Sequence, residues 1–250
     1  YSNILEGYNA NEIVAELQQA MEDYADENFG DDFDYKFTGE QEQMAENMEF
    51  LSQALLIAVF AIFLILVTQF NSVVSPFIII LSILFSTIGV FLGYWATEMD
   101  LILVMTGIGI ISLAGIVVNN AIVLIDYIDF LRNRRRQELK VDTLPDEEVR
   151  IAIIKGGKTR LRPVLLTAVT TILGLIPLAI GFNFNFSTFI TDLDPEIFIG
   201  GDNAVFWGAM SWTIVYGLIF ATFLTLVVVP VMYWLAFKLT SGVKRLFRGA

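Results

Sequence analysis

Five long runs of apolar residues dominate the chain and predict five membrane-spanning helices. The runs lie at about 51–70, 77–96, 101–125, 163–181 and 204–237. Each is long enough to cross the hydrocarbon core of a bilayer, about 30 Å thick, at about 1.5 Å per helical residue. Pro177 and Pro230 lie inside two of the runs, where kinks are tolerated if neighbouring groups satisfy the freed carbonyls. The pattern therefore predicts a mainly α-helical membrane domain over 51–237.

The first 50 residues follow a different pattern, which predicts water-exposed α+β structure. Apolar residues at helical spacing predict a helix that begins near Asn9 and ends near Gly30. Phe33, Tyr35 and Phe37 alternate with polar residues and predict a half-buried strand. One helix and two strand remnants bury too little surface to fold alone. We therefore expect this segment to complete a domain whose remainder lies outside the chain, and to lead through a Glu- and Met-rich helix into the first span.

Basic residues gather in two places and predict the orientation of the spans. Ten of the 15 Lys and Arg residues lie between Arg132 and Arg162, and four more follow the last apolar run. Cytoplasmic segments carry the excess of Lys and Arg in membrane proteins. We therefore expect the 126–162 connection and the tail 238–250 in the cytoplasm, and residues 1–50 outside. Acids after Pro145 and the Lys155-Gly156-Gly157 sequence predict a short cytoplasmic helix over about 144–156.

Two adjacent amides, Asn119 and Asn120, lie near the middle of the third apolar run. Lipid offers no hydrogen-bond partner at that depth, so polar groups there must find one inside the protein. The residues that share a helix face with Asn119, by spacings of three, four or seven, are Ser112, Gly115 and Asp126. We expect this small, polar stripe to face other helices and the aliphatic side to face lipid. The amides are either glue between helices or members of a network that senses protonation of a nearby carboxylate, since an amide itself does not titrate near neutral pH.

A second small, polar stripe follows the fourth run. Arg160 and Thr167 are seven residues apart and share a face with Thr170, Thr171 and Gly174, so the two stripes are expected to meet. Arg160 also suits a simple anchor at the membrane boundary, and a Thr hydroxyl can bond its own helix backbone.

Asp126 is a secondary candidate for the same network. It lies about 10 Å beyond Asn119 along the helix axis. This depth is near the expected cytoplasmic interface, where an acid close to Arg132 can also be a hydrated helix-end residue.

Composition supports a membrane protein and excludes several chemistries. The chain is 56% hydrophobic with a mean hydropathy of +0.66, and it contains no Cys and no His. Disulfides, thiol catalysis and the usual zinc sites are excluded, and no catalytic triad or phosphate loop is present, so we expect neither an enzyme nor a cofactor or metal. The basic run Arg134–Arg136 lies beside a span and is an orientation signal rather than a nucleic-acid interface. The chain begins at Tyr1 without a signal-peptide pattern, and we expect it to be a piece of a longer polypeptide.

Three sequence stretches resemble the resistance–nodulation–cell division (RND) permeases, and most closely their multidrug branch. They are LVTQFNSVVSPFIIILSILFSTIGV (66–90), GIVVNNAIVLIDY (115–127) and RLRPVLLTAVTTILGLIPLA (160–179). The resemblance implies that the five spans are the last five of twelve, and that residues 1–50 end a periplasmic porter subdomain. Members of this family are homotrimers in the inner membrane of Gram-negative bacteria that export drugs and other amphiphiles in exchange for protons. They usually work with a periplasmic adaptor protein and an outer-membrane channel.

The resemblance also implies roles for individual residues. Asn119 stands where many drug exporters have a lysine, and Asn120 matches the asparagine after it. Arg160 and Thr167 match an arginine and a threonine of the same proton relay, which is driven by the proton motive force. In those exporters the lysine pairs with acids on span four, in an N-terminal half of the permease that this chain does not include. A neutral Asn119 cannot supply that counter-charge, so the resemblance leaves the proton stoichiometry open.

Two other functions fit the same scaffold. One is a heavy-metal or lipid exporter, and the lack of Cys and His and the sparse Met residues argue only mildly against metal. The other is a membrane scaffold or accessory subunit that does not transport. An acid on the fourth span of the missing half would favour transport.

Overall fold

The computed structural model describes residues 17, 19–21, 24, 40–70, 72–185, 190 and 197–248. The chain divides into two units, residues 1–46 and 47–250. In the first unit, residues 17, 19–21 and 24 are helical, within the helix expected between Asn9 and Gly30. The predicted strand at 33–37 lies outside the described residues, so the α+β porter segment stays a prediction.

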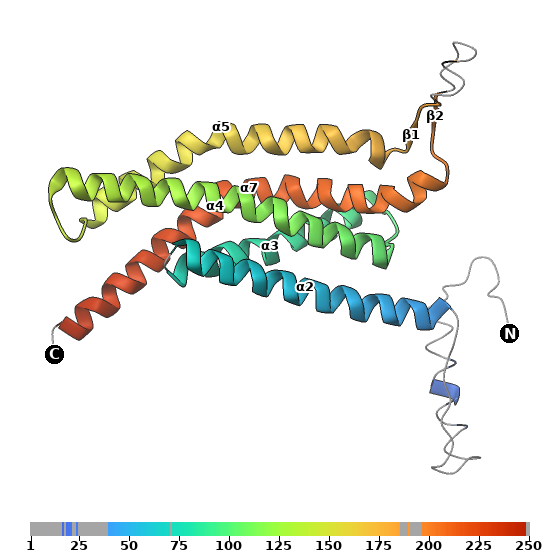
Figure 1. Cartoon of the computed structure of the whole chain (residues 1–250), viewed down its shortest axis with the longest axis horizontal. Coiled ribbons are helices and arrows are strands. Elements are labelled where there is room, and N and C mark those ends of the chain that lie inside the picture. Colours follow the sequence, from blue (N-terminus) through green and yellow to red (C-terminus); the bar gives the residue numbers. More distant parts are fainter. Residues whose placement is uncertain are drawn as a thin grey trace. The chain divides into compact units, whose positions relative to one another are not determined.

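Long helices make up most of the described chain (Figure 1). In chain order they are α2 Glu40–Phe70, α3 Val74–Thr97, α4 Leu103–Leu139, α5 Asp146–Ala179 and α7 Asp202–Arg248. All five are long and apolar enough to cross a membrane, which confirms the predicted fold class of five membrane helices. α2 is continuous, as expected for a Glu- and Met-rich helix that runs into the first span.

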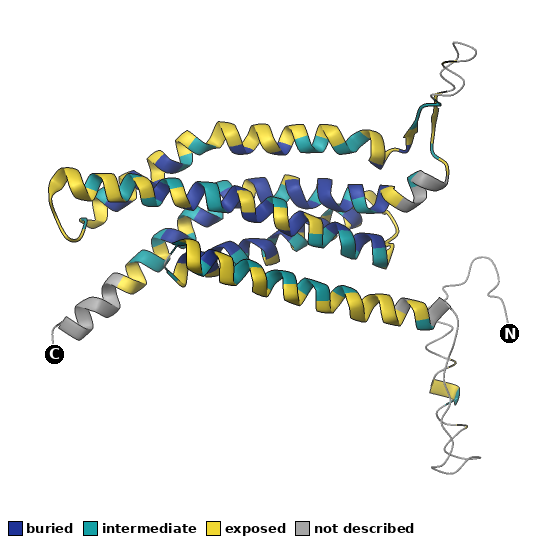
Figure 2. Ribbon diagram, viewed as in Figure 1, coloured by how far each residue is buried: buried dark blue, intermediate teal, exposed yellow. Residues whose placement is uncertain are grey.

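The core of the bundle lies between α3, α4 and α7, whose facing sides hold most of the buried residues in Figure 2. One cluster centres on Leu124 and Ile128 of α4, with Ile79 of α3 and Val229 of α7. A second cluster joins Val90, Leu113 and Leu218 on the same three helices. Membrane helices gain little from burying apolar surface against one another, so close van der Waals packing must hold these contacts.

Glycines on α3 permit that close packing against α7. A Cβ atom added to Gly89 would lie 2.2 Å from Cβ of Phe220, and one added to Gly93 would lie 2.2 Å from Cγ of Tyr216. Both distances are far inside van der Waals contact. Small residues thus let the backbone of α3 approach the aromatic side chains of α7.

A buried hydrogen-bond network joins the same three helices near the start of α4. The hydroxyl of Tyr94 on α3 donates to the carbonyl of Ala209 on α7 at 2.8 Å. It also lies 2.9 Å from the hydroxyl of Thr213 and 3.3 Å from that of Thr106 on α4. A tyrosine that is only 3% exposed is therefore satisfied by groups on both neighbouring helices.

The structure corrects the prediction of a separate cytoplasmic helix over 144–156. One helix, α5, runs from Asp146 through Gly156, Gly157 and Pro163 to Ala179. Gly156 lies inside this helix and not at its end. A Cβ atom at Gly156 would lie 2.6 Å from Cγ1 of Ile128, so the glycine allows α5 to approach α4 closely. Pro163 removes only the bond that would reach the Thr159 carbonyl, and the helix continues past it.

A short antiparallel hairpin joins α5 to α7, and the sequence analysis did not predict it. Its strands are β1 Phe182–Asn183 and β2 Phe198–Ile199. Gly181, which precedes β1, has a φ of +69°, which favours glycine. A Cβ atom at this position would also collide with the side chain of Ala204. The hairpin makes α5 and α7 antiparallel neighbours.

α7 is longer than the predicted span 204–237, because it continues to Arg248. Figure 1 shows that α7 changes direction along its length, and Pro230 lies inside it. A proline inside a helix removes a backbone hydrogen bond and commonly kinks it.

Candidate functional site

The predicted polar stripe of α4 forms one continuous exposed face. Ser112, Gly115, Asn119 and Asp126 are all exposed. A Cβ atom added to Gly115 would meet nothing within 4 Å. The residues of the stripe therefore share one face of α4, as predicted, but none of the described helices covers this face. The expectation that it faces other helices is not met by the described part of this chain.

The two amides point to different sides of α4. Asn119 is exposed, whereas Asn120 is only 6% exposed, beside Val117 and Ala121 of the core. Neither amide side chain makes a hydrogen bond with any other residue that the structure describes. Adjacent residues are about 100° apart around a helix, so one amide faces the bundle while the other faces outward.

Arg160 of α5 lies against α4, at the level of Asp126 and Tyr127. Its guanidinium carbon lies 4.5 Å from the centroid of the Tyr127 ring, a cation–π geometry. Its Nε atom is buried and has no hydrogen-bond partner among the described residues. The structure thus brings Arg160 of α5 onto α4 at Tyr127, the residue that follows Asp126.

Thr167 is exposed and bonded within its own helix. Its hydroxyl lies 3.0 Å from the carbonyl oxygens of both Pro163 and Val164. No hydrogen bond joins it to Asn119, Asn120 or Arg160 among the residues that the structure describes. The four predicted relay residues therefore lie on two neighbouring helices but are not bonded to one another.

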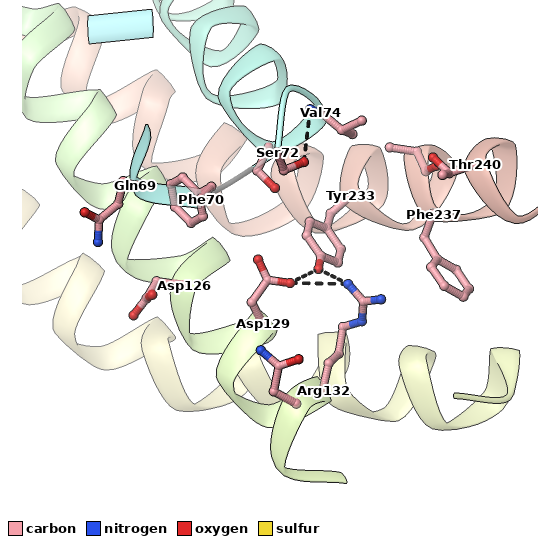
Figure 3. A pocket seen from close by; sticks show the side chains of 13 residues that line it. Gln69, Phe70, Ser72, Val74, Asp126, Asp129, Arg132, Tyr233, Phe237 and Thr240 are labelled. Carbon is pink, nitrogen blue, oxygen red and sulfur yellow. Dashed lines mark hydrogen bonds and ion pairs between the residues drawn. The ribbon is translucent and has the colours of Figure 1, made fainter. Parts of the chain in front are cut away.

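A polar cavity of about 460 Å³ lies between α4, α7 and the α2–α3 connection (Figure 3). Asp126 lines it, together with charged, amide and hydroxyl residues that the sequence analysis did not select as site residues. They are Gln69, Ser72, Asp129, Arg132, Asn133, Tyr233 and Thr240. Asp129 is ten residues beyond Asn119, about 15 Å along the axis. If Asn119 lies at mid-bilayer, the cavity lies at the membrane boundary.

Three of these side chains form a cross-helix cluster, drawn with dashed lines in Figure 3. The hydroxyl of Tyr233 on α7 donates to Oδ1 of Asp129 on α4 and accepts from Nη1 of Arg132. Nη1 of Arg132 lies 3.3 Å from the same Asp129 oxygen. The Arg132 guanidinium also lies 5.2 Å from the centre of the Phe237 ring. The cluster joins the ends of α4 and α7 through charge-assisted hydrogen bonds.

Asp126 is exposed and lies on the same cavity as Arg132, but it is not the acid that pairs with this arginine. Both line the cavity, but the ion pair of Arg132 is with Asp129. Residues three apart on a helix are neighbours, whereas residues six apart are separated by about 9 Å along the axis and face different directions. The spacing of Asp129 and Arg132 was a signal available in the sequence. Tyr233 was not, because it lies 104 residues from Asp129.

No metal site is evident in the part of the chain that the structure describes, where no three Asp, Glu, Cys or His residues lie close enough to hold a metal ion. The available polar groups are amides, hydroxyls, arginines and isolated acids. This donor set suits hydrogen-bond and proton chemistry in a membrane domain.

The profile of the AcrB/AcrD/AcrF family matches residues 2–184. The chain belongs to the AcrB/AcrD/AcrF family. This confirms the resemblance to RND permeases, and the chain is a multi-pass membrane protein of that family.

Individual relatives carry names from different functions. The chain is 35% identical to the swarming motility protein SwrC of Bacillus subtilis over 78% of its length and 16% of the relative. It is 29% identical to the multidrug resistance protein MdtC of Erwinia tasmaniensis over 72% of its length and 15% of the relative. The crystal structure of a heavy metal efflux pump matches its fold with a TM-score of 0.66 and 24% identity, over 92% of this chain and 20% of that one. The chain thus spans a fifth or less of these proteins.

Proposed function

We propose that this chain is part of a proton-driven RND exporter, and that α4 and α5 carry its half of the proton relay. The observation that carries the proposal is the exposed polar face of α4. A helix that is otherwise aliphatic presents Ser112, Gly115 and Asn119 where no described helix covers them. Polar groups at that depth require a protein partner, because lipid cannot satisfy them.

The partner that this face fits is a helix carrying a carboxylate, in the part of the permease outside this chain. An amide both donates and accepts hydrogen bonds, whereas an ionised carboxylate only accepts and a protonated one also donates. The Nδ2 group of Asn119 would donate to the ionised acid, and its Oδ1 would accept from the protonated acid. Asn119 can therefore follow the protonation state without titrating.

Arg160 supplies a fixed positive charge to the relay, beside Tyr127 of α4. Its guanidinium rests on Tyr127, and its buried Nε has no partner among the described residues. A buried, unpaired donor is costly unless another state of the protein satisfies it. We infer that a shift of α4 against α5 gives this donor an acceptor, which makes the two helices a two-state element. Asn120, Thr167 and Asp126 are the other members that we assign to the network.

The test uses the full permease in proteoliposomes with an imposed pH gradient. Asn119→Ala should lower proton-coupled export at least tenfold, because the amide contact with the acid is lost, while the trimer stays intact on size-exclusion chromatography. Thr87→Ala is the matched control, since this hydroxyl bonds only the backbone of its own helix, at 2.7 Å from the Leu84 carbonyl. Wild-type export by Asn119→Ala would remove this residue from the relay.

The substrate class has two candidates. Amphiphilic drugs are favoured by the relative MdtC, and divalent metals by the heavy metal efflux pump that shares the fold. We place drugs and other amphiphiles first and metals or lipids second. Parallel export assays with an amphiphilic dye and with Zn²⁺ would separate them.

The assembly that we propose follows the RND family. The chain would function with the N-terminal half of the same permease, as a homotrimer in the inner membrane of a Gram-negative bacterium, with a periplasmic adaptor and an outer-membrane channel. Residues 1–50 would be periplasmic and the C-terminus cytoplasmic. The competing function is a scaffold subunit that does not transport, and absence of any proton flux from the intact permease would favour it.

A further inference from the structure

A second groove lies between α5 and α7, on a different part of the bundle from the polar cavity. Its volume is about 490 Å³. Most of its wall is apolar and is formed by Ile154, Leu161, Val227, Pro230, Val231 and Trp234. Two basic residues of α5, Arg150 and Lys158, also line it. The groove therefore combines an apolar wall with positive charge.

The contacts of α5 with α4 indicate how deep in the bilayer this groove lies. Gly156 of α5 packs on Ile128 of α4, which is nine residues, about 14 Å, beyond Asn119. With Asn119 near mid-bilayer, Gly156 and the neighbouring Lys158 lie at the hydrocarbon boundary. Arg150 lies further out, and Leu161 lies further in. On α7, which runs in the opposite direction, Trp234 is the outer residue and Val227 the inner one.

The groove thus has a charged outer end and an apolar inner end. Leu161, Val227 and Val231 are each about half exposed, at 45%, 47% and 52%, so no described helix covers this part of the groove. Trp234 lies 5.3 Å beneath the ammonium group of Lys238, and this combination of Trp and Lys is typical of the membrane interface. Pro230 of α7 also lines the groove, and a proline inside a helix removes one backbone hydrogen bond.

The basic end remains able to bind an anion. The only ion pair of Arg150 among the described residues is with Glu147, at 4.0 Å, and both side chains are more than 60% exposed. Such a pair is weak and competes poorly with a phosphate. Lys158 is exposed and has no ion pair within the described part of the chain.

We propose that this groove is a binding site for an anionic phospholipid. The headgroup phosphate would lie between Arg150 and Lys158, and one acyl chain would follow Leu161, Val227 and Val231 toward the bilayer centre. Basic pockets between membrane helices on the cytoplasmic side are suited to anionic headgroups. The proposal rests on the membrane placement of α5 and α7 and not on the proton relay.

The test measures contact between lipid and Trp234 in the full permease. The protein is reconstituted in nanodiscs containing phosphatidylglycerol or phosphatidylcholine whose acyl chains carry bromine, a contact quencher of tryptophan fluorescence. Subtracting the signal of Trp234→Phe isolates Trp234 from the other tryptophans. We expect stronger quenching by the brominated phosphatidylglycerol at equal mole fraction. Equal quenching by both lipids would overturn the proposal, because it would show only the annular lipid that surrounds any membrane helix.

A charge variant tests the headgroup site itself. Arg150→Gln/Lys158→Gln should lower the apparent affinity for phosphatidylglycerol roughly 25-fold, since each basic residue near the surface contributes about fivefold. The matched control is Arg136→Gln/Lys140→Gln, which removes the same charge from the exposed end of α4. We expect the control to keep the preference for phosphatidylglycerol. An equal loss in both variants would overturn the site, because it would assign the preference to the overall charge of the surface.

Discussion

The three central helices and the two outer helices of this bundle differ in burial, although all five are apolar. Of the 18 residues that form the most apolar stretch of each helix, 44–50% are buried in α3, α4 and α7. In α2 and α5 the buried share is only 6% and 11%. α2 has the most apolar window of all, yet it is the least buried. Apolarity therefore indicates which helices enter the membrane, but it does not indicate which helices pack together.

Small residues explain the difference better. Gly89 and Gly93 on α3 lie against aromatic side chains of α7. In contrast, Gly174 on α5 and Gly115 on the outer face of α4 have nothing within 4 Å of an added Cβ. Close packing is the main source of helix association in lipid. The filled glycines mark close contacts within this chain, whereas Gly115 and Gly174 lie on faces that no described helix covers.

The largest effect is expected from filling a packed glycine. Gly89→Ala forces a methyl group to within 2.2 Å of Cβ of Phe220, which cannot rotate away because its position is set by the backbone. Overpacking of this kind costs about 1–3 kcal/mol. We expect a clear fall in the thermal unfolding temperature of the full permease, measured by size-exclusion chromatography after heating.

Gly174→Ala is the matched substitution on an outer helix. Alanine has a higher helix propensity than glycine by about 1 kcal/mol, and the described chain offers no collision. If α5 is uncovered in the permease, this variant should be neutral or more stable than wild type. A loss of stability equal to that of Gly89→Ala would show that another helix packs on Gly174, and the comparison would then extend to the missing half.

The next effect is expected at the polar end of the central helices. Asp129→Ala leaves the guanidinium of Arg132 without its acid, while Nε of Arg132 already has no partner in the part of the chain that the structure describes. Breaking a buried pair costs about 3–5 kcal/mol, but both side chains here are about 30% exposed, so we expect roughly 2 kcal/mol. The measurement is the same thermal assay.

A control in the connection after α4 separates this cluster from exposed charge. Asp142→Ala removes an exposed acid of the α4–α5 connection and should leave the unfolding temperature unchanged. If Asp129→Ala were equally silent, the Asp129–Arg132–Tyr233 cluster would not hold α4 to α7.

A smaller effect is expected from the buried network at the other end. Tyr94→Phe removes the donor to the Ala209 carbonyl and the contacts with Thr106 and Thr213. Interhelical hydrogen bonds in membrane proteins average about 0.6 kcal/mol, and Thr213 keeps its own bond to Ala209, so we expect about 1 kcal/mol. Tyr216→Phe is the control, because its hydroxyl bonds lie at the exposed edge of the bundle. Equal shifts in both variants would mean that the buried position adds nothing.

Much of the fold could be predicted from the sequence, because membrane insertion depends on local apolarity. The five runs gave five helices, and spacing placed Ser112, Gly115 and Asn119 on one face of α4. The separate helix over 144–156 was wrong, because Gly156 serves a contact with Ile128 that lies 28 residues away in sequence. A glycine at a helix end and a glycine at a close helix crossing have the same local signature.

The candidate site was less predictable. Arg160 lies beside α4 as the two stripes suggested, but its contact is the Tyr127 ring rather than an amide. The cluster of Asp129, Arg132 and Tyr233 needs a hydroxyl from α7, and no local pattern assigns Tyr233 to α4. The relay itself needs a carboxylate that this chain does not contribute at mid-membrane, so its roles remain predictions.

The smallest effect is expected from an ion pair near the surface that joins the outer helix α5 to α4. Arg135 donates from Nε and Nη2 to the two carboxylate oxygens of Glu148, at 2.7 and 3.1 Å. A double-mutant cycle with Arg135→Gln and Glu148→Gln should give a favourable coupling that is smaller than the Tyr94→Phe effect. Exposed ion pairs are weak, because water screens them and two long side chains must be held in place.

The salt dependence of the coupling distinguishes an ordinary surface ion pair from one that is shielded from water. At about 0.1 M salt the screening length is roughly 10 Å, and at 1 M it is roughly 3 Å, so the coupling should disappear between these concentrations. The pair Arg134–Glu138, which lies within α4 at 3.1 Å, has the same chemistry but joins no second helix, and removing it should not change the unfolding temperature. Coupling that persists at 1 M salt would mean that Arg135 and Glu148 are shielded from water in the permease. The end of α5 would then be held as firmly as α3 and α7, and the division into central and outer helices would apply only to its membrane part.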